Sequence, residues 1–271
     1  MEWSKLKNII ILLLAATNLG LFSFVWGREW KQSRQLEQAR AQAIEFLDSH
    51  SVETPNDQIP ERMELLPRQV ERDLGQEQAA AASLLAGQVQ QERWGIDAYR
   101  YFNENGWVQF QGDGTFSANF SAGFLPLGDN RKKTCVEVLE RLGFEASLVK
   151  AEWETLTFCQ NWEGVPLFNQ QVTLRCGGEE LVAITAGRRL MGVPTVIEGW
   201  EPVTVATAIF DFYNGLTGLG DVCSRVDAIQ QGYVSSVETS GPVTLIPVWR
   251  VDTDTGRYQL DTMTGQLTRL T

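Results

Sequence analysis

Histidine is almost absent from this chain, which has a single histidine, His50, in 271 residues. Multi-histidine metal centres and most histidine-based acid and base chemistry need more than one imidazole, so they are excluded unless His50 serves alone. His50 follows a predicted helix, and a cation there is favoured by the helix dipole. We therefore interpret His50 as a helix-terminus residue rather than a catalytic one.

Catalytic sequence motifs are also missing. The chain contains no GxSxG, SxxK or HExxH motif, no Walker-type loop, and no GxGxxG followed by a predicted helix. The glycine-rich run 112–114 is interpreted as a hairpin tip, because it lacks the helix that a phosphate loop needs. We predict that the protein is not an enzyme and that it has no catalytic residue, no cofactor and no metal site.

Two pairs of closely spaced carboxylates are the remaining candidates for chemistry. Glu152/Glu154 and Asp252/Asp254 each lie on one face of a strand-like segment, as a glycosidase pair would. Exposed acids on the wet face of a sheet have the same pattern, which we favour. Asp252, Asp254 and Gly256 match only part of a calcium loop, and a simple turn explains them.

Cysteine is scarce, with four residues in the chain. None has the CxxC or zinc-ribbon spacing. An even number of cysteines permits disulfides in an oxidising compartment, while free cysteine often behaves as a small buried hydrophobe. The sequence leaves both states open for Cys135, Cys159, Cys176 and Cys223.

Basic residues are outnumbered: 23 Lys and Arg stand against 34 Asp and Glu, giving a formal net charge of -11. Such an acidic chain is poorly suited to nucleic acid or to an anionic membrane surface. We predict no nucleic-acid partner, which leaves a protein partner or the solvent.

The chain does have one long uncharged run, which begins at Ile9 and ends at Trp26. At about 1.5 Å per residue, this run nearly spans a hydrocarbon core of about 30 Å. Trp3, Trp26 and Trp30 lie at its two ends, where amphipathic rings favour the headgroup level. We predict a transmembrane helix over residues 9–27 that binds the lipid bilayer.

A cleaved secretory signal is the alternative, because Lys5 and Lys7 precede the apolar run. Val25, Trp26 and Gly27 make a poor cleavage site, so we favour a retained anchor. A short tail followed by a large translocated domain is typical of a signal anchor. We expect a single-pass protein of the cell membrane, with a cytoplasmic N-terminus and an extracytoplasmic bulk.

Small and polar residues occur within this predicted span. Ala16 and Gly20 form a small-xxx-small face on which another transmembrane helix can approach closely, and Asn18 can hydrogen-bond across such a contact. These three residues are our partner-contact candidates.

The segment after the span predicts a helical stalk. Residues 29–48 contain neither Gly nor Pro, and apolar residues recur three or four positions apart. We expect this stripe to pack on the protein's own domain rather than on a partner. Its members are Leu36, Ala39, Ala43, Phe46 and Leu47.

The rest of the chain predicts an α+β fold. Alternating apolar residues between turn signals such as Asn105-Gly106 indicate antiparallel strands, and each helix laid across such strands would bury one of their faces. The expected helices cover 71–91, 131–142 and 203–213. The expected strands cover 98–102, 107–111, 115–120, 146–159, 165–176, 181–186, 228–237, 243–251, 258–261 and 266–269.

These elements suggest tandem units, each a helix followed by an antiparallel meander. Pro166 and Gly187 bracket one meander as Pro247 and Gly265 bracket another, which indicates an internal repeat. The predicted parts are a cytoplasmic tail (1–8), the transmembrane helix (9–27), the stalk (28–50), a first extracytoplasmic α+β unit (51–125) and a second region (126–271) that contains the repeats 126–200 and 201–271.

Residues at both ends of the chain carry a family resemblance. The opening residues 1–7, running into an Ile/Leu-rich span, resemble the start of YycI proteins of Gram-positive bacteria. Gly232-Tyr233, residues 247–251, residues 256–258 and Thr264-Gly265 resemble the closing strands of the YycH/YycI family. Ile59-Pro60 and residues 84–87 fit more loosely, and the middle of the chain adds little.

The resemblance implies a regulator rather than an enzyme. Members of this family work with a YycH-like partner and control the WalK-like sensor histidine kinase of the WalK/WalR (YycG/YycF) two-component system, which governs cell-wall metabolism. It implies transmembrane and extracytoplasmic contacts and supplies no catalytic residues. It does not indicate whether the kinase is activated or inhibited.

A second function stays open from the residues themselves. Trp107, Phe110 and Phe116 lie in neighbouring predicted strands, and a sheet face that bears them would bind an envelope ligand such as a wall fragment or a lipid. Aromatic residues in strands are more often part of a core, so this extracytoplasmic ligand-binding module is the alternative hypothesis.

Overall fold

The computed structural model describes residues 14, 17, 33–55, 57–236 and 242–270. Except for residues 14 and 17, the predicted span falls outside these residues, as do the candidates Ala16, Asn18 and Gly20. Within the described part of the chain, no helix is both long and apolar enough to cross a membrane.

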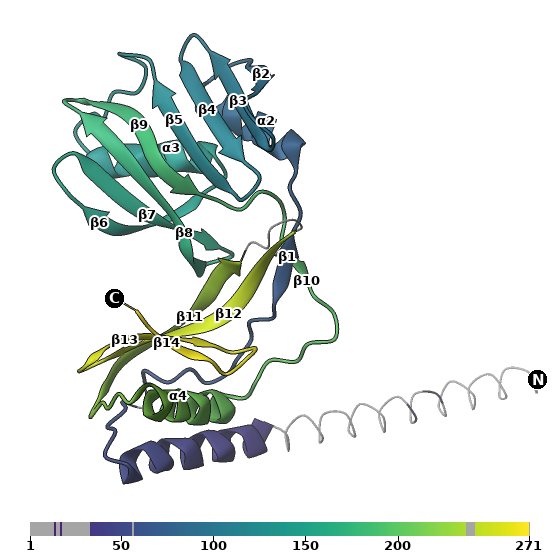
Figure 1. Cartoon of the computed structure of the whole chain (residues 1–271), viewed down its shortest axis with the longest axis vertical. Helices are drawn as coiled ribbons and strands as arrows, with labels where there is room; N and C mark the ends of the chain where they lie inside the picture. Colours follow the sequence, from purple (N-terminus) through teal and green to yellow (C-terminus); the bar gives the residue numbers. More distant parts are fainter. Residues whose placement is uncertain (1–13, 15–16, 18–32, 56, 237–241, 271) are drawn as a thin grey trace, which may run out of the picture.

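The fold is a mixed α+β architecture, as predicted, built on a large and mostly antiparallel sheet (Figure 1). One arrangement, a helix followed by a meander of four antiparallel strands, occurs three times in the described chain. We call these three segments the first, second and third modules.

The three modules have the following bounds. The first comprises α2 (Leu74–Leu84), β2 (Gln90–Arg93), β3 (Ala98–Asn103), β4 (Gly106–Gln111) and β5 (Thr115–Phe120). The second comprises α3 (Arg131–Arg141), β6 (Glu145–Ala151), β7 (Thr155–Trp162), β8 (Val165–Gly177) and β9 (Glu180–Arg188). The third comprises α4 (Val205–Leu219), β11 (Val226–Ser236), β12 (Val243–Thr253), β13 (Gly256–Asp261) and β14 (Leu267–Leu270).

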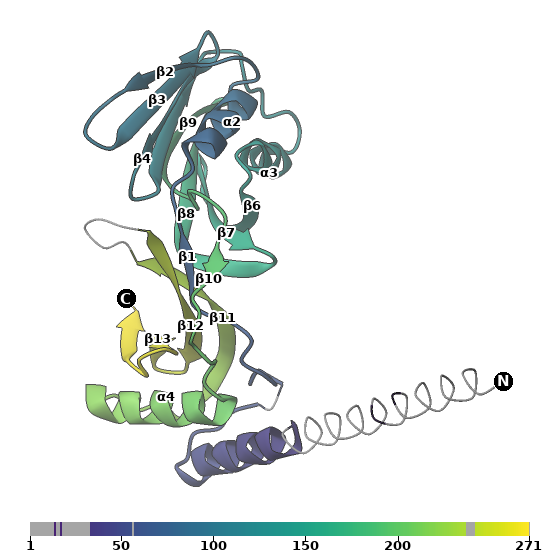
Figure 2. The ribbon, with the colours of Figure 1, turned by 90° about the vertical axis from the view of Figure 1, so that its right-hand side faces the viewer.

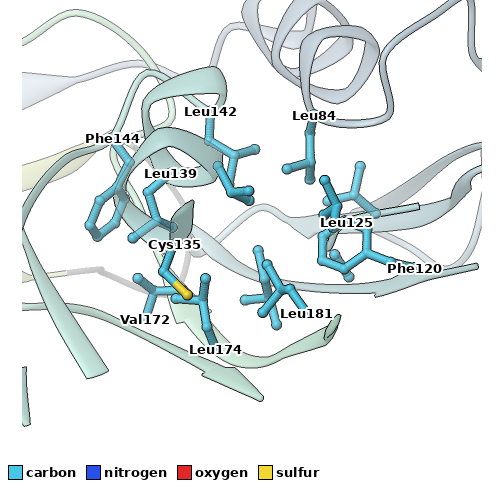
Figure 3. Packing of buried hydrophobic residues seen from close by; sticks show 14 of the residues in the cluster. Leu84, Phe120, Leu125, Cys135, Leu139, Leu142, Phe144, Val172, Leu174 and Leu181 are labelled. Carbon is cyan, nitrogen blue, oxygen red and sulfur yellow. The ribbon is translucent and has the colours of Figure 1, made fainter. Parts of the chain in front are cut away.

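The first two modules form one layer with one core. Their last strands, β5 and β9, pair antiparallel. The two parts of the chain on either side of the predicted boundary between residues 125 and 126 therefore share one sheet. Both α2 and α3 cover the same face of this layer (Figure 2). Figure 3 shows Leu84 of α2, Leu139 of α3 and Leu174 of β8 converging in the core between them. Among the described residues, no helix lies on the opposite face of the layer (Figure 2).

The third module joins this layer through a short junction. Tyr233 of β11 pairs in parallel with Leu167 of β8. Both side chains are fully buried, and the Tyr233 hydroxyl donates to the Leu66 carbonyl at 2.9 Å. Two short strands, β1 (Arg68–Val70) and β10 (Thr195–Val196), extend the sheet beyond β12.

The predicted stalk is helical over its described part, residues 33–49, which we call the N-terminal helix. It lies beside α4 in both views of the ribbon (Figures 1 and 2). Ala43 and Leu47 are buried in the same core as Ile209 and Phe212 of α4, while Leu36 stays exposed. The expectation that the stripe packs on the protein's own domain is confirmed for Ala43 and Leu47.

His50 closes this helix as the sequence predicted. Its Nδ1 atom lies 2.8 Å from the Phe46 carbonyl oxygen, which also accepts hydrogen bonds from the His50 backbone N–H and the Ser49 hydroxyl in the last turn of the helix. Its ring also lies 4.9 Å from that of Tyr213 in α4. His50 therefore helps to fix the end of the N-terminal helix against α4.

Several predicted elements were wrong at their ends. The helix expected over 71–91 stops at Leu84, because Ala86 takes a φ of 51° and the amide of Asn105 donates to the Leu85 carbonyl. Part of the remaining segment is strand β2, whose polar residues have little strand propensity and are held by pairing with β3. The run expected over 146–159 is a hairpin of β6 and β7.

The helix expected over 203–213 begins later and ends later than predicted, because the prediction took Gly215 and Gly218 as its end. The helix continues through Gly215 and Gly218 and ends at Gly220, whose φ of 71° suits a left-handed cap. Gly215 is required for packing instead, since a Cβ placed there would lie 2.4 Å from the Leu267 Cβ. Gly218 is exposed, and a Cβ placed there would have no neighbouring atom within 4 Å.

This difference predicts opposite effects for one substitution at two neighbouring sites. Gly215→Ala should destabilise the fold by about 1–3 kcal/mol, because its methyl group pushes β14 away from α4. Gly218→Ala should stabilise it by about 0.5 kcal/mol through helix propensity. Urea unfolding of both variants measures the difference, and equal midpoints would refute the close packing of α4 on β14.

All four cysteines are free thiols, which settles the alternative that the sequence left open. Burial and the neighbouring Cys176 raise the pKa of Cys135 to about 12. Burial and the charge of Asp254 raise the pKa of Cys223 to about 11, although Cys223 is only half-buried.

We expect iodoacetamide at about pH 8 to modify native protein slowly, at Cys223 first, because thiolate is rare and the other sulfurs are covered. In urea without reductant, all four thiols should react. Intact-mass spectrometry counts the adducts. Fewer than four in urea would mean that a disulfide exists.

Candidate functional site

The described structure places the aromatic residues of the alternative hypothesis on opposite faces of the sheet. Phe110 and Phe116 are buried in the core beneath the helices. Trp107 lies on the face that carries no helix, where the Arg100 guanidinium stacks 4.6 Å from its ring and 3.4 Å from that of Trp94. The three predicted aromatics therefore do not form one surface, while Trp94, Arg100 and Trp107 do.

The carboxylate pairs are each engaged in structural contacts. Glu152 accepts hydrogen bonds from Lys150 and Thr155, which lower its pKa. Asp254 accepts from the hydroxyl and backbone of Ser224, and these bonds lower its pKa as well. A general acid of a glycosidase has a raised pKa, so neither residue matches that pattern. In the described residues, no group of three or more metal-ligating side chains occurs.

A cleft lies between the second and third modules, and arginine side chains contribute to its lining. It has a volume of about 480 Å³ and is lined by β6, β7 and β8 on one side and by β11, β12 and β13 on the other. We call it the inter-module cleft. Its lining includes Leu148, Val149, Asn161, Phe168, Gln171, Gln230, Arg250, Asp252 and Arg257.

Strand periodicity places Arg250 in this cleft. In β12, Trp249 and Val251 point into the core beneath α4, so Arg250 between them points to the opposite face. Its neighbours across the ladder are Gln230 of β11 and Gln259 of β13. The same strand thus contributes to the core on one side and to the cleft on the other.

Arg250 is held over an aromatic ring. Its guanidinium carbon lies 4.0 Å from the ring centre of Phe168 in β8. Phe168 can lie this close to the third module because Gly232 of β11 has no side chain: a Cβ there would lie 2.6 Å from the Phe168 ring. The contact therefore joins the two modules at the cleft.

The charge of Arg250 is poorly compensated. Burial lowers its pKa, and its Nε atom is buried without a hydrogen-bond partner among the described residues. Asp252, the carboxylate next to it on this face, is paired with Arg257 instead. The charge of Asp252 acts to raise the pKa of Arg250 but does not overcome the effect of burial, so a further anion in the cleft would stabilise this half-buried cation.

No sequence pattern predicted this cleft. Gly232 and Arg250 belong to segments that carry the family resemblance, and the available signal was an arginine inside an apolar alternating strand. Its partner Phe168 lies far away in the sequence and meets it only in the folded protein.

The chain matches no family model and no curated protein sequence. Two solved structures are similar to it over much of their length. One is an uncharacterized protein from Eubacterium rectale ATCC 33656, with a TM-score of 0.39 and 10% identity, covering 78% of this chain and 87% of that one. The other is the Bacillus megaterium YpeB C-terminal domain, with a TM-score of 0.35 and 15% identity, covering 75% of this chain and 99% of that one. Neither similarity is close enough to establish a shared fold.

Proposed function

We propose that this chain is a single-pass, membrane-anchored regulator of a WalK-like sensor histidine kinase, with a YycH/YycI-like architecture of tandem helix-and-meander modules. Its N-terminus lies in the cytoplasm and its bulk outside. It acts through transmembrane and extracytoplasmic contacts with the kinase and with a YycH-like protein, without catalysis. Ala16, Asn18 and Gly20 form the transmembrane part of these contacts.

One observation supports this proposal most directly: the N-terminal helix is docked on the third module. The ring of Phe46 lies 4.9 Å from that of Phe210 and 5.1 Å from that of Tyr213, both in α4. Arg40 also donates two hydrogen bonds to the carbonyls of Ile59 and Pro60. A helix fixed in this way transmits a movement of the outer modules to the segment that precedes it.

The same packing connects the helix to the inter-module cleft. Trp249 and Val251 of β12 share a core with Ala43 and Leu47 of the N-terminal helix. Arg250, between these two core residues, faces the cleft. A partner bound in the cleft would therefore shift the populations of two helix positions, and a coupling of about 1–3 kcal/mol would alter kinase output several-fold.

Co-purification tests the proposal. The full chain, a variant with the span replaced by an unrelated transmembrane helix, and Gly20→Leu are each expressed in cells that contain the kinase. We expect the kinase to be recovered with the native span and lost with the other two, while the outer modules keep their unfolding midpoint. Recovery of the kinase with none of the three would contradict the proposal.

A second function, binding of an envelope ligand, is favoured by a separate observation. Arg100 is sandwiched between Trp94 and Trp107 on the helix-free sheet face, and Trp94 is 52% exposed. The exposed part of the Trp94 indole is available for stacking with a ligand. If wall fragments change the tryptophan fluorescence of the purified chain and Trp107→Ala removes that change, ligand binding is favoured over kinase regulation as the function.

A further inference from the structure

Arg250 differs from the other arginines of the third module in its burial and in its hydrogen bonding. Arg225, Arg257 and Arg269 each have a carboxylate oxygen within 3.2 Å or less. Arg250 is less exposed than these three, yet its Nε atom has no acceptor among the described residues. The inter-module cleft thus contains a guanidinium whose Nε–H donor is not used by the part of the chain that the structure describes.

The geometry of Arg250 suits a carboxylate. Stacking on Phe168 fixes the plane of the guanidinium, so little side-chain freedom remains to be lost on binding. A planar guanidinium binds a carboxylate through two parallel hydrogen bonds, which are among the stronger ones in proteins. Arg257 is less available because Asp252 already pairs with it.

The rest of the lining suits a peptide rather than a bare anion. Leu148 and Val149 expose apolar surface beside the cleft, at 36% and 55%. The exposed amide of Gln230 matches the donors and acceptors of a peptide backbone, while Asn161 and Gln171 already donate to Ser147 and to the Phe168 carbonyl. Strand β6, which lines the cleft, pairs with β7 and with no other described strand, so it is an edge of the sheet. Free sheet edges accept extended peptide segments.

We infer that the inter-module cleft binds an extended segment of a partner protein, and that Arg250 holds an acidic side chain of that segment. The inference rests on the proposed function, because the segment belongs to a protein that this chain contacts. The apolar neighbours of the acidic residue would lie against Leu148 and Val149.

The experiment uses the full chain in detergent micelles and two fluorescently labelled peptides with amidated C-termini. One has the sequence Leu-Val-Glu-Val-Leu, and the other has Gln in place of Glu. Fluorescence anisotropy measures their affinity for the native chain, Arg250→Gln, Arg250→Lys and Arg175→Gln, with empty micelles as the blank. Arg175 is an exposed arginine of β8 outside the cleft lining, so Arg175→Gln removes the same charge elsewhere.

We expect the Glu peptide to bind the native chain about tenfold more tightly than the Gln peptide. Arg250→Gln should make the affinities for the two peptides equal. Arg250→Lys should retain part of the preference for the Glu peptide, because lysine keeps the positive charge but cannot form two parallel hydrogen bonds. Arg175→Gln should retain the whole preference. Equal affinities for the native chain, or a preference that survives Arg250→Gln, would overturn the inference.

A further arm separates a peptide site from a general anion site. If sodium acetate at the peptide's concentration displaces the Glu peptide completely, the cleft recognises only a carboxylate and the peptide part of the inference is wrong. A negative result with the peptides would not count against the proposed function. Co-purification of the kinase through the native span does not depend on either peptide.

Discussion

Replacing Glu77 with glutamine is expected to lower the free energy of unfolding by about 3 kcal/mol, since Glu77 is the buried member of an ion pair. Glu77 is 1% exposed and accepts two hydrogen bonds from Arg72, at 2.8 and 3.1 Å. Burial acts to lower the pKa of Arg72, but Glu77 and Asp97 together raise it above its ordinary value.

Glu77 also serves a second arginine. Arg189 is 8% exposed, its Nη1 atom has no hydrogen-bond partner among the described residues, and burial lowers its pKa. The charge of Glu77 offsets part of that effect. Glutamine at position 77 would leave Arg189 without this compensation, while Arg72 would keep its contact with Asp97.

Glu137→Gln is the matched control for this prediction. Glu137 pairs with Lys133 one turn away on α3 at 3.8 Å, and both side chains are more than half exposed. Exposed pairs of this kind contribute at most about 0.5 kcal/mol. Chemical unfolding compares the two variants, and a similar small loss for both would show that Glu77 is not a buried counter-charge.

Trp249→Ala is expected to cost about 3–5 kcal/mol, because it removes a large side chain from a core that cannot fully collapse. Trp249 is 1% exposed and packs beneath α4 and the N-terminal helix. Its indole N–H also lies 2.8 Å from the Met63 sulfur. The loss should therefore loosen the docking of the N-terminal helix as well as lower overall stability.

The comparison for Trp249 is Trp153→Ala. Trp153 is 89% exposed at the turn between β6 and β7, so its side chain contributes little to the fold. We expect a change of less than about 0.5 kcal/mol there. Equal losses at both positions would contradict the core beneath α4.

Local signals explain which elements could be predicted from the sequence. Asn130 caps α3 with its side chain, and a turn at residues 104 and 105, followed by Gly106 with a φ of 138°, joins β3 to β4, so both were found near their observed limits. The polar strand β2 and the short strands β1 and β10 were missed, because pairing partners elsewhere in the chain hold them in place. The end of α4 was misplaced because Gly215 serves packing against Leu267 rather than helix termination.

The candidate site was harder to predict than the fold. The cleft depends on the approach of β8 to β11, which a single parallel pair and the missing side chain of Gly232 permit. No periodic pattern within one segment encodes such a contact between distant strands. The partner-contact candidates Ala16, Asn18 and Gly20 lie outside the described residues and stay predictions.

The most direct test of the account is kinase autophosphorylation in vesicles that contain the WalK-like kinase and the full chain. The account predicts that the native chain changes the phosphorylation level and that Phe46→Ser abolishes this change, because Phe46 holds the N-terminal helix on α4. Glu45→Ser, on the exposed side of the same helix, should act like the native chain. A Phe46→Ser chain that regulates the kinase as well as the native one would contradict the claim that the docked helix transmits the signal.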